Sequence, residues 1–424
     1  MSAQRQSLLA SSSTDVQAFY ERMPYPAPLT DLDRYRHLYD DPDTRRALFH
    51  RMWPTELFGE KREILIAGCG TSQAARYALR EPNSRITAID ISKASLTHTR
   101  KLQRKYDLEN LDLRQVPIER VQQLGRAFDQ IVCTGVLHHM PEPDTGLRAL
   151  REVLDPQGAI QLMVYAKYGR AGIYMIKEYC RLLGIGDSND DLSELGATLK
   201  GLPPEHSIAA VMRSAKDFNS PEALADALLH PVDRSYSVPE LYDWLKRCGM
   251  SFGRWIEQAP YLPQCGMIAS SPHSERLNSL SAPLQYAAVE LFRGTMVKHD
   301  LIVYRDDRVG ESQPITFAGN AWRQYVPIHL PWTVTVRERV PPDRVAVLIN
   351  RSHTFTDLIL TVDKDEDRLL GAIDGKRTLA DIVELVGRNG DECRVLNFFE
   401  RLWQYDQVVF DASRTASKSV EPRR

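Results

Sequence analysis

The chain has 424 residues, of which 43% are hydrophobic and 26% are charged, and its formal net charge is −2. This composition is typical of a globular protein with two or three cores, and the low charge gives no bulk attraction to nucleic acid or to an anionic membrane. The six cysteines are scattered without a Cys-x-x-Cys pair, which argues against a disulfide framework and a zinc site and favours a reducing cytoplasm.

Residues 1–55 are predicted to form an N-terminal arm or lid. Prolines stand at every second position in Phe19-Tyr-Glu-Arg-Met-Pro-Tyr-Pro-Ala-Pro28, so this segment is predicted to be extended or polyproline rather than helical. Tyr20 and Tyr25 would then stand on a semi-rigid strap. They are interpreted either as substrate-contacting residues of a lid or as packing residues on the domain surface.

The next segment predicts a nucleoside-binding turn. Glu63-Ile-Leu-Ile-Ala-Gly-Cys-Gly-Thr71 indicates a buried strand followed by a glycine turn, and Ile86-Thr-Ala-Ile-Asp90 indicates a second strand that ends on a carboxylate. Gly68 and Gly70 have no Cβ, so the backbone can turn tightly and approach a ligand closely. A carboxylate at the end of the second strand can accept hydrogen bonds from ribose hydroxyls.

The elements that follow predict an α/β sheet. Phe128–Pro141 indicates a strand that runs into a loop with paired histidines, followed by a helix over Thr145–Val153, a turn over Leu154–Gly158 and a strand over Ala159–Tyr165. Alternating strands and helices predict a parallel sheet covered on both faces, with the ligand beyond the carboxyl ends of the strands. Gln73 stands where a dinucleotide-binding loop has its third glycine, which disfavours NAD and FAD.

These segments, in this order, resemble the class I S-adenosylmethionine-dependent methyltransferases, well over 63–165 and more loosely to about Ser270. The resemblance implies a doubly wound Rossmann-like sheet, S-adenosyl-L-methionine as cofactor, and methyl transfer to an acceptor. It implies that the glycine loop wraps the methionine part of the donor, that Asp90 holds the ribose, and that Pro117 to Glu119 flank the adenine. The cofactor-binding residues implied in this way are Ala67, Gly68, Cys69, Gly70, Thr71, Asp90, Ile91, Pro117, Ile118, Thr134 and Gly135.

Two positions depart from the family pattern. Many members have an acidic residue where Ile66 stands, and an aspartate is common where Pro117 stands. The first change should remove a contact to the ammonium group of the donor. The second removes an acceptor for the adenine amine, so backbone groups would have to substitute for it.

Catalytic and acceptor residues are predicted around the transfer face. His138, His139 and Tyr165 are the candidate catalytic residues, because an oxygen or nitrogen acceptor can require a base and histidine titrates near neutral pH. The alternative is that the histidines only shape the pocket. Further candidate substrate residues are Tyr168, Arg170, Arg234 and Tyr236. The alternative for the first two is an aromatic packing cluster with Arg170 in solvent, and the alternative for Arg234 is an ion pair with Asp233 or another surface carboxylate.

The predicted organisation beyond the arm has four parts. A methyltransferase domain spans 56–272 and contains a mainly helical insertion at about 172–229. After the insertion, Ser237 and Glu240 have capping-box spacing before a helix over Leu241–Cys248. An α+β C-terminal region follows, with a β-rich module over 283–362, which includes a strand over His299–Tyr304, a winged-helix-like module over 363–412, and a disordered tail over 413–424.

The winged-helix prediction depends on three short helices and a terminal strand. Ile373–Ile382 is similar to the small peptide-binding winged-helix domains of ribosomal-peptide modification pathways. The candidate recognition helix, Asp391–Tyr405, begins with two acidic residues, which phosphate would repel, so nucleic acid is not an expected partner. Binding of a peptide or protein, or simple domain packing, is the expected role of this module.

Two functional classes remain open from the sequence. The first is a methyltransferase acting on a small molecule, a peptide or a protein. The second is a non-catalytic adenosylmethionine-binding scaffold or regulatory protein with a C-terminal recognition module. Turnover of the donor distinguishes them. A nicotinamide oxidoreductase is disfavoured by Gln73, and no metal site or membrane segment is predicted, while a homo-oligomer remains open.

Overall fold

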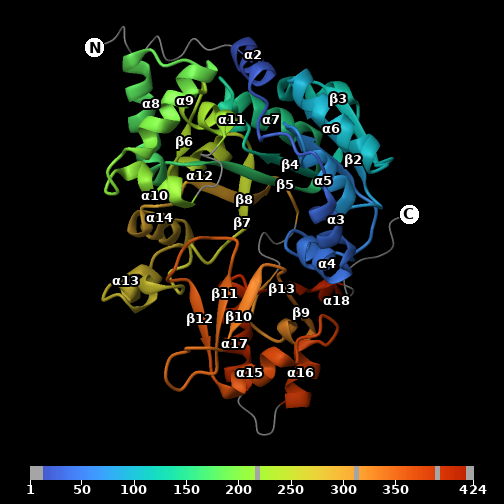
Figure 1. Ribbon diagram of the computed structural model, residues 1–424. Coiled ribbons are helices and arrows are strands. Elements are labelled where there is room, and N and C mark those ends of the chain that lie inside the picture. The colour runs from blue at the N-terminus through green and yellow to red at the C-terminus, as the bar shows by residue number, and fades with distance from the viewer. Residues whose placement is uncertain (1–12, 215–219, 310–314, 387–391, 417–424) are drawn as a thin grey trace. The chain divides into compact units, whose positions relative to one another are not determined.

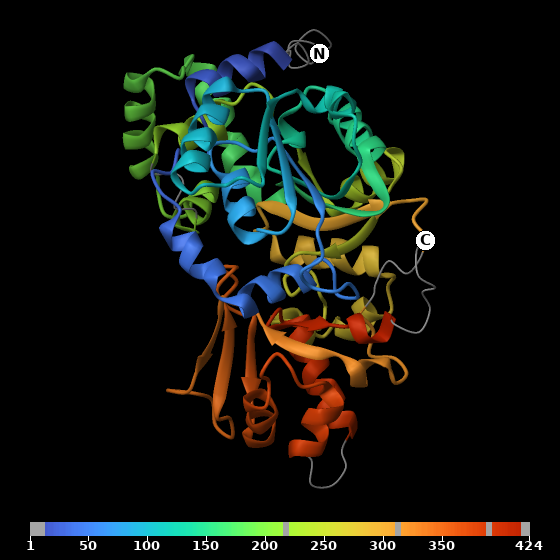
Figure 2. The same ribbon diagram turned by 90° about the vertical axis from the view of Figure 1, so that its right-hand side faces the viewer.

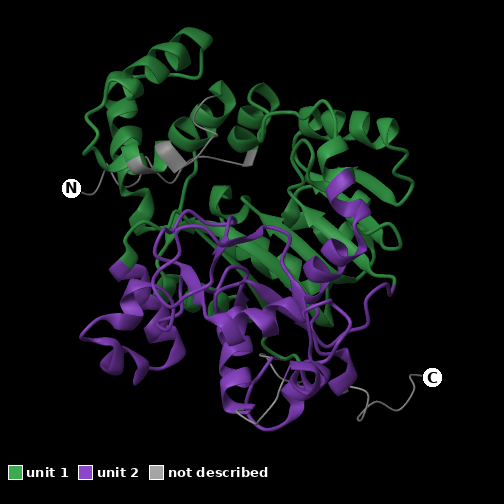
Figure 3. Cartoon of the chain, turned by 60° about the horizontal axis from the view of Figure 1, so that its bottom comes forward, with its two compact units in different colours: residues 1–36, 61–252, 293–309 green, residues 37–60, 253–292, 310–424 purple. Residues whose placement is uncertain are grey.

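A computed structural model describes residues 13–214, 220–309, 315–386 and 392–416. The chain divides into two compact units, shown in separate colours in Figure 3. Unit 1 comprises 1–36, 61–252 and 293–309, and unit 2 comprises 37–60, 253–292 and 310–424. The chain therefore passes between the units several times, whereas the predicted domains were consecutive. Residues 37–55, predicted in the arm, and 253–272, predicted in the methyltransferase domain, belong to unit 2.

An eight-stranded sheet forms the centre of unit 1. Its strand order is β3-β2-β1-β4-β5-β8-β7, and β6 pairs with β5 (Figure 1). The first five strands are parallel, as predicted. Ile64, Leu65 and Ile66 are completely buried, which explains the uninterrupted apolar run, since helices cover both faces of a parallel sheet. The strands are β1 (Glu63–Ala67), β2 (Arg85–Asp90), β3 (Leu111–Gln115), β4 (Phe128–Thr134), β5 (Leu154–Ala166), β6 (Ser235–Tyr236), β7 (Met250–Trp255) and β8 (Lys298–Arg305).

One strand belongs to a different sheet from the predicted one. The strand expected over His299–Tyr304 exists as β8, but it pairs antiparallel with β5 in unit 1, where Ile160 lies opposite Val303, rather than in a C-terminal β-rich module. The apolar pattern of β8 predicts a buried strand but carries no information about its partner. β5 is also longer than predicted, because it begins at Leu154 and includes the expected turn over 154–158.

Helices lie on both sides of this sheet (Figure 1, Figure 2). The predicted insertion is helical, and its last turn is a π-helix. The predicted capping box at Ser237 and Glu240 is present at the start of α12. The helices of this part are α5 (Gln73–Arg80), α6 (Lys93–Lys105), α7 (Pro143–Val153), α8 (Ala171–Leu183), α9 (Asn189–Lys200), α10 (Ser207–Ser214), α11 (Pro221–Leu224), the π-helix η6 (Ala225–Leu229) and α12 (Val238–Arg247).

The N-terminal arm is partly helical, contrary to the prediction for its first residues. Helix α2 (Ser13–Arg22) includes Phe19 to Arg22, and only the proline-containing segment after it is non-helical. Proline restricts its own backbone conformation and that of the residue before it. Pro24 therefore prevents helix only from Met23 onward. Val16 and Phe19 are buried, and their spacing of three residues places them on one helix face. Helix α3 (Asp33–Asp40) follows.

Unit 2 combines small antiparallel sheets with short helices. Strands β10, β11 and β12 form one sheet, and β9 pairs with β13. Its core combines buried aliphatic residues with buried aromatic residues, among them Trp322, Tyr325, Phe398 and Phe410. The elements are α4 (Pro42–His50), α13 (Ser274–Asn278), α14 (Ala282–Arg293), β9 (Val326–His329), β10 (Thr333–Val336), β11 (Ala346–Asn350), β12 (Ile359–Val362), α15 (Lys364–Gly371), α16 (Leu379–Val386), α17 (Glu392–Gln404), β13 (Val408–Asp411) and α18 (Ser413–Ala416).

The segment predicted to be a winged helix contains the three expected helices, α15, α16 and α17. Its terminal strand β13 pairs with β9, which precedes residues 363–412 in the chain. The pairing partner of β13 therefore lies outside the predicted module. The winged-helix assignment stays a prediction. Residues 413–416, predicted to belong to a disordered tail, form α18, whereas 417–424 and the predicted helix start Asp391 lie outside the described residues.

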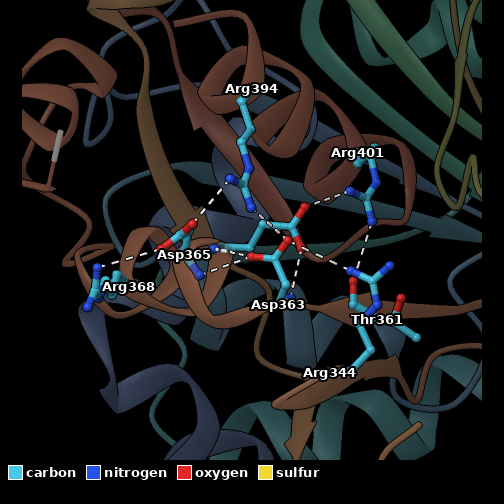
Figure 4. Close-up of polar contacts among 8 residues, drawn as sticks. Arg344, Thr361, Asp363, Asp365, Arg368, Arg394 and Arg401 are labelled. Atoms are coloured by element: carbon cyan, nitrogen blue, oxygen red, sulfur yellow. Dashed lines mark hydrogen bonds and ion pairs between the residues drawn. The ribbon is translucent and has the colours of Figure 1, made fainter. Parts of the chain in front are cut away.

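The arginines of α17 are engaged within unit 2. Arg394 contacts Asp363 at 2.8 Å and Asp365 at 3.1 Å, and Arg401 contacts Glu366 at 2.8 Å (Figure 4). Asp363 and Glu366 also form the capping box of α15. These carboxylates fix the arginine side chains against the neighbouring helix, so the two guanidinium groups already have anionic partners.

Buried Asp406 makes the stability of unit 2 depend on pH. Its side chain accepts a hydrogen bond from the Ala259 amide at 2.9 Å, and burial raises the pKa of Asp406 to about 7. This folded-state value exceeds that of the unfolded chain, so the stability contributed by the protonated acid is complete below about pH 4 and is lost as pH rises through about 7.

We therefore expect Asp406→Asn to raise the free energy of unfolding at pH 8 by up to about 4 kcal/mol, with little change at pH 4. Asparagine tolerates the positive φ of 51° at this position. Denaturant unfolding between pH 4 and pH 8 measures the difference. Asp343→Asn is the matched control, because Asp343 has a φ of 62° and is exposed. An unfolding difference that does not vary with pH would contradict the expectation.

Among the residues that the structure describes, the helices are all too short or too polar to cross a bilayer.

Candidate functional site

Unit 1 contains a cavity of about 310 Å³ at the carboxyl ends of β1, β2, β4 and β5. This volume lies at the lower end of the range for small-molecule sites. Its lining residues come from the arm, the glycine turn, the strand ends and the helical insertion: Val16, Tyr20, Tyr25, Pro26, Gly68, Cys69, Gly70, Gln73, Arg76, Asp90, Ile91, Ser95, Val116, Pro117, Ile118, Glu119, Thr134, Gly135, Val136, His139, Met140, Pro141, Met163, Tyr165 and Asp226.

The glycine turn needs glycine both for its backbone and for space. Gly68 has a φ of +70°, and a Cβ at this position would lie 2.4 Å from Cγ2 of Val136. Gly70 has a φ of +55°, and its Cβ would lie 3.1 Å from the carbonyl oxygen of Tyr25. Positive φ favours glycine, and a Cβ at position 68 would displace a neighbouring wall of the cavity.

Asp90 connects the glycine turn to the end of β2. One carboxylate oxygen accepts a hydrogen bond from the Gly70 amide at 2.8 Å, and the other accepts one from the Ser92 amide at 2.8 Å. Burial raises the pKa of Asp90, and the backbone donors of Ser92, Gly70 and Ile91 counteract that shift. A carboxylate has about four acceptor positions, so Asp90 retains the capacity to accept hydrogen bonds from ligand hydroxyls.

The arm lies over this turn. Thr71 Oγ1 donates to the carbonyl of Pro26 at 2.7 Å, and Ser92 Oγ donates to the carbonyl of Tyr20 at 3.3 Å. Glu21 accepts hydrogen bonds from the Lys93 amide at 2.6 Å and from the next amide at 3.1 Å, at the start of α6. The arm is thus attached at several points beside the cavity that its own side chains line.

The opposite part of the cavity is lined by 116–119, which lead into the 3-10 helix η2 (Ile118–Leu124). Gln73, which occupies the position of the missing third glycine, donates from Nε2 to Thr134 Oγ1 at 2.7 Å. Two of the predicted cofactor residues do not line the cavity: Ala67 and Thr71 are buried beside it. The other predicted cofactor residues all line it.

Asp226 is a cavity residue that was not predicted from the sequence. It lies in the π-helix η6, it is 3% exposed, and its two oxygens accept hydrogen bonds from Tyr20 at 3.0 Å and from Tyr165 at 3.3 Å. The available signal was a single acidic residue within the apolar run Ala223-Leu-Ala-Asp-Ala-Leu-Leu229. A buried carboxylate requires hydrogen-bond partners, and π-turns occur frequently at functional sites.

The paired histidines of η3 (Leu137–His139) differ in position. His139 lines the cavity, and its Nδ1 contacts the carbonyl of Val232 at 2.7 Å. Because a carbonyl only accepts, Nδ1 must carry the proton and Nε2 the lone pair. Burial lowers the pKa of His139 to about 4, so the ring is neutral at pH 7.

His138 is not among the cavity residues. It is fully buried with its ring 3.8 Å from that of Tyr165, and among the described residues neither of its ring nitrogens has a hydrogen-bond partner. Burial lowers the pKa of His138 well below its usual value. The structure therefore brings His139 and Tyr165 to the cavity, but not His138.

The predicted substrate residues also separate into two groups. Tyr20 and Tyr25 line the cavity, whereas Tyr168, Arg170, Arg234 and Tyr236 do not. Tyr168 and Arg234 are exposed, and Tyr236 stacks on Trp244. Arg170 is 5% exposed and pairs with Asp233 at 3.1 Å, with its guanidinium over the ring of Tyr165. Asp233 thus forms its ion pair with Arg170 rather than with Arg234, the next residue in the sequence.

Residues 65–160 match the protein family described as a methyltransferase domain. The chain is 34% identical over 235 residues to an uncharacterized protein of Synechococcus sp., and the matched region covers 54% of this chain and 56% of that protein. It is 28% identical over 144 residues to a ubiquinone biosynthesis O-methyltransferase of Bordetella avium, and this matched region covers 30% of this chain and 57% of that protein. The chain thus spans little more than half the length of these curated relatives.

Solved structures share the fold. PKMT2 from Rickettsia typhi is similar with a TM-score of 0.61 and 14% sequence identity, over 86% of this chain and 73% of that chain. The same protein in complex with AdoHcy is similar with a TM-score of 0.60 and 13% identity, over the same shares of the two chains. These likenesses confirm the predicted Rossmann-like α/β fold.

Proposed function

We propose that the protein is a methyltransferase that uses S-adenosyl-L-methionine. The match of residues 65–160 to a methyltransferase domain supports this proposal. The observation that carries the proposal is the common cavity. A glycine turn fixed by Asp90 opens into the same space as Tyr165, His139 and Asp226. The donor supplies a methyl group already activated on a sulfonium, so positioning and exclusion of water are the main tasks of the protein.

The residues present fit this donor. Gly68 and Gly70 leave room beside the backbone, Asp90 offers free acceptor positions for ribose hydroxyls, and Pro117 with Ile118 provides an apolar face for the adenine. We assign the arm the role of a lid, because its side chains line the cavity. It is also attached beside the cavity, through the Pro26 carbonyl to the glycine turn and through the Glu21 side chain to the start of α6.

The remaining proposals concern partners and location. Unit 2 would bind a peptide or protein through its C-terminal helices, and the ion pairs of Arg394 and Arg401 support this over nucleic acid. A reducing cytoplasm is supported by the six cysteines, which all lie within the described residues as thiols rather than in disulfides, with five of them buried. Self-association stays open.

Asp90→Ala is expected to weaken S-adenosylmethionine binding by about 1 to 3 kcal/mol, because ribose hydroxyls and the Gly70 amide lose an acceptor. Isothermal titration measures the change. Asp129→Ala is the matched control: Asp129 also accepts a backbone hydrogen bond, from the Glu63 amide at 2.8 Å, but does not line the cavity. Equal affinities of the Asp90 variant and the unmodified protein would remove the ribose assignment.

Turnover separates an enzyme from a binding scaffold. The purified protein is incubated with S-adenosylmethionine and a bacterial extract, and S-adenosylhomocysteine is quantified by mass spectrometry. We expect product formation that increases with both protein and extract and that is lost in the Asp90 variant at low donor concentration. Donor binding without any product would instead support the non-catalytic class.

A further inference from the structure

The acceptor side of the cavity is organised around Asp226. Its two oxygens accept hydrogen bonds from Tyr20 of the arm and from Tyr165 at the end of β5, so three distant segments meet at one carboxylate. Burial raises the pKa of the Tyr20 phenol, and the charges of Asp226 and, less strongly, of Asp90 raise it further. Tyr20 is therefore close to both the proposed ribose-binding carboxylate and Asp226.

Cationic groups near Asp226 have other contacts. Arg170 and Lys177 attract it electrostatically, but their ion pairs are to Asp233, at 3.1 and 3.4 Å. The guanidinium of Arg170 also lies over the Tyr165 ring, and neither cationic side chain lines the cavity. The one cationic side chain in the described lining, Arg76, donates to Tyr35 at 3.0 Å and lies over its ring.

Burial raises the pKa of Asp226, and the nearby carboxylate of Asp233 raises it further. Two histidines near Asp226 are uncharged at neutral pH. Burial lowers the pKa of His139 to about 4 and that of His230 to about 2, so both rings are neutral. Tyr25, which affects the pKa of Tyr165, adds a third phenol to the same side of the cavity. Both side chains that donate to Asp226 are thus phenols, and among the described residues no cationic side chain forms an ion pair with it.

A carboxylate surrounded by aromatic rings has the chemistry of a cation site. An ammonium can donate to the free lone pairs of the carboxylate and lie against the ring faces. An anionic acceptor would be repelled by the ionised carboxylate, whereas an ammonium would stabilise the ionised form, which burial disfavours. We propose that Asp226, with Tyr20 and Tyr165, binds a basic amine and that this amine is the methyl acceptor. This inference rests on the methyltransferase function proposed above.

The transfer balances with the groups named. The bound ammonium first loses a proton to Asp226, which passes it to solvent. The nitrogen lone pair then forms the new N–C bond while the C–S bond of the donor breaks, with its electron pair remaining on sulfur. The products are a methylated ammonium and S-adenosylhomocysteine. Asp226 both holds the charged acceptor and receives its proton.

The chemical class of the product tests the inference, and the acceptor need not be identified in advance. S-adenosylmethionine with a labelled methyl group is incubated with the protein and a bacterial extract, and labelled small molecules and hydrolysed proteins are separated. We expect label in N-methylamines, which survive mild base and bind a cation exchanger. Label in methyl esters, ethers or thioethers would overturn the amine assignment and leave the methyltransferase proposal intact. Absence of transferred label would overturn both.

Asp226→Asn then tests the residue, with the unmethylated amine that corresponds to the labelled product as substrate. The amide has the shape of the acid and can still bond both phenols, but it has no charge. We expect the KM for the amine to rise at least about tenfold, while the affinity for S-adenosylhomocysteine stays within about twofold. Glu222→Gln, which removes a carboxylate from the neighbouring α11 outside the cavity, should change neither value.

Two outcomes would overturn the role of Asp226: an unchanged KM for the amine, or an equal loss of donor affinity. Tyr165→Phe provides a second variant if the Asp226 variant does not fold. It keeps the ring and removes the hydroxyl group that donates to Asp226, so the KM for the amine should change while circular dichroism and donor affinity do not. An unchanged KM in this variant would also contradict the proposed cluster.

Discussion

Gly68→Ala is expected to weaken S-adenosylmethionine binding by at least about 30-fold. An L-residue at a φ of +70° costs about 1 to 2 kcal/mol. The new Cβ would also lie 2.4 Å from Cγ2 and 2.8 Å from Cγ1 of Val136, so Val136 or the turn must move. Both residues line the cavity, and the displacement therefore alters the space for the donor. Isothermal titration with the donor measures the loss.

Two further variants separate the clash from the backbone strain. Gly125→Ala is the matched control, because Gly125 has a φ of +63° but has nothing within 4 Å of the added Cβ and lies outside the cavity. It should lose stability without losing donor affinity. The double variant Gly68→Ala with Val136→Ala should recover part of the affinity, since the colliding methyl groups are absent. No recovery, or equal losses in both glycine variants, would contradict this account of the turn.

Asp233→Ala is expected to lower the free energy of unfolding by about 3 to 5 kcal/mol. The Asp233 side chain is 1% exposed and contacts Arg170 at 3.1 Å and Lys177 at 3.4 Å, and Tyr174 donates to it at 3.3 Å. The cationic neighbours hold the pKa of Asp233 below its usual range although burial raises it. Its removal leaves the guanidinium of Arg170 buried without its anionic partner. Urea denaturation at pH 7 measures the change.

The exposed pair of Arg22 and Asp187 provides the comparison. These side chains are 58% and 33% exposed and lie 2.6 Å apart. Exposed pairs contribute about 0 to 1 kcal/mol, so Asp187→Ala should change the unfolding free energy by less than about 1 kcal/mol. If the two aspartate variants were equally stable, the buried cluster around Asp233 would not contribute to the fold as described.

The sequence predicted the parallel part of the sheet because local chemistry determines it. A continuous apolar run such as Ile64–Ile66, a turn with obligatory glycines and a strand that ends on Asp90 each depend on near neighbours in the chain. The position of β8 is not determined by local chemistry. Its apolar residues indicate a buried strand but do not indicate the strand with which it pairs. Pairing with β5 is a long-range property, and the sequence pattern of either strand is compatible with several partners.

The candidate site shows the same limit. The glycine turn and Tyr25 lie within recognisable local patterns, whereas Asp226 is one acid in a helix whose position depends on the packing of the whole insertion against the arm. Arg170 and Arg234 were equivalent in sequence, but burial selects Arg170 as the partner of Asp233 and leaves Arg234 exposed. Assignments that depend on burial therefore required the structure.

Isothermal titration of the purified protein with S-adenosylmethionine, S-adenosylhomocysteine and NAD tests the donor site most directly. We expect micromolar binding of both adenosyl compounds, because Gly68, Gly70 and Asp90 line the cavity together. We expect no binding of NAD, because Gln73 replaces the third glycine of a dinucleotide-binding loop. Binding of NAD alone, or of none of the three, would contradict the donor assignment and the functions built on it.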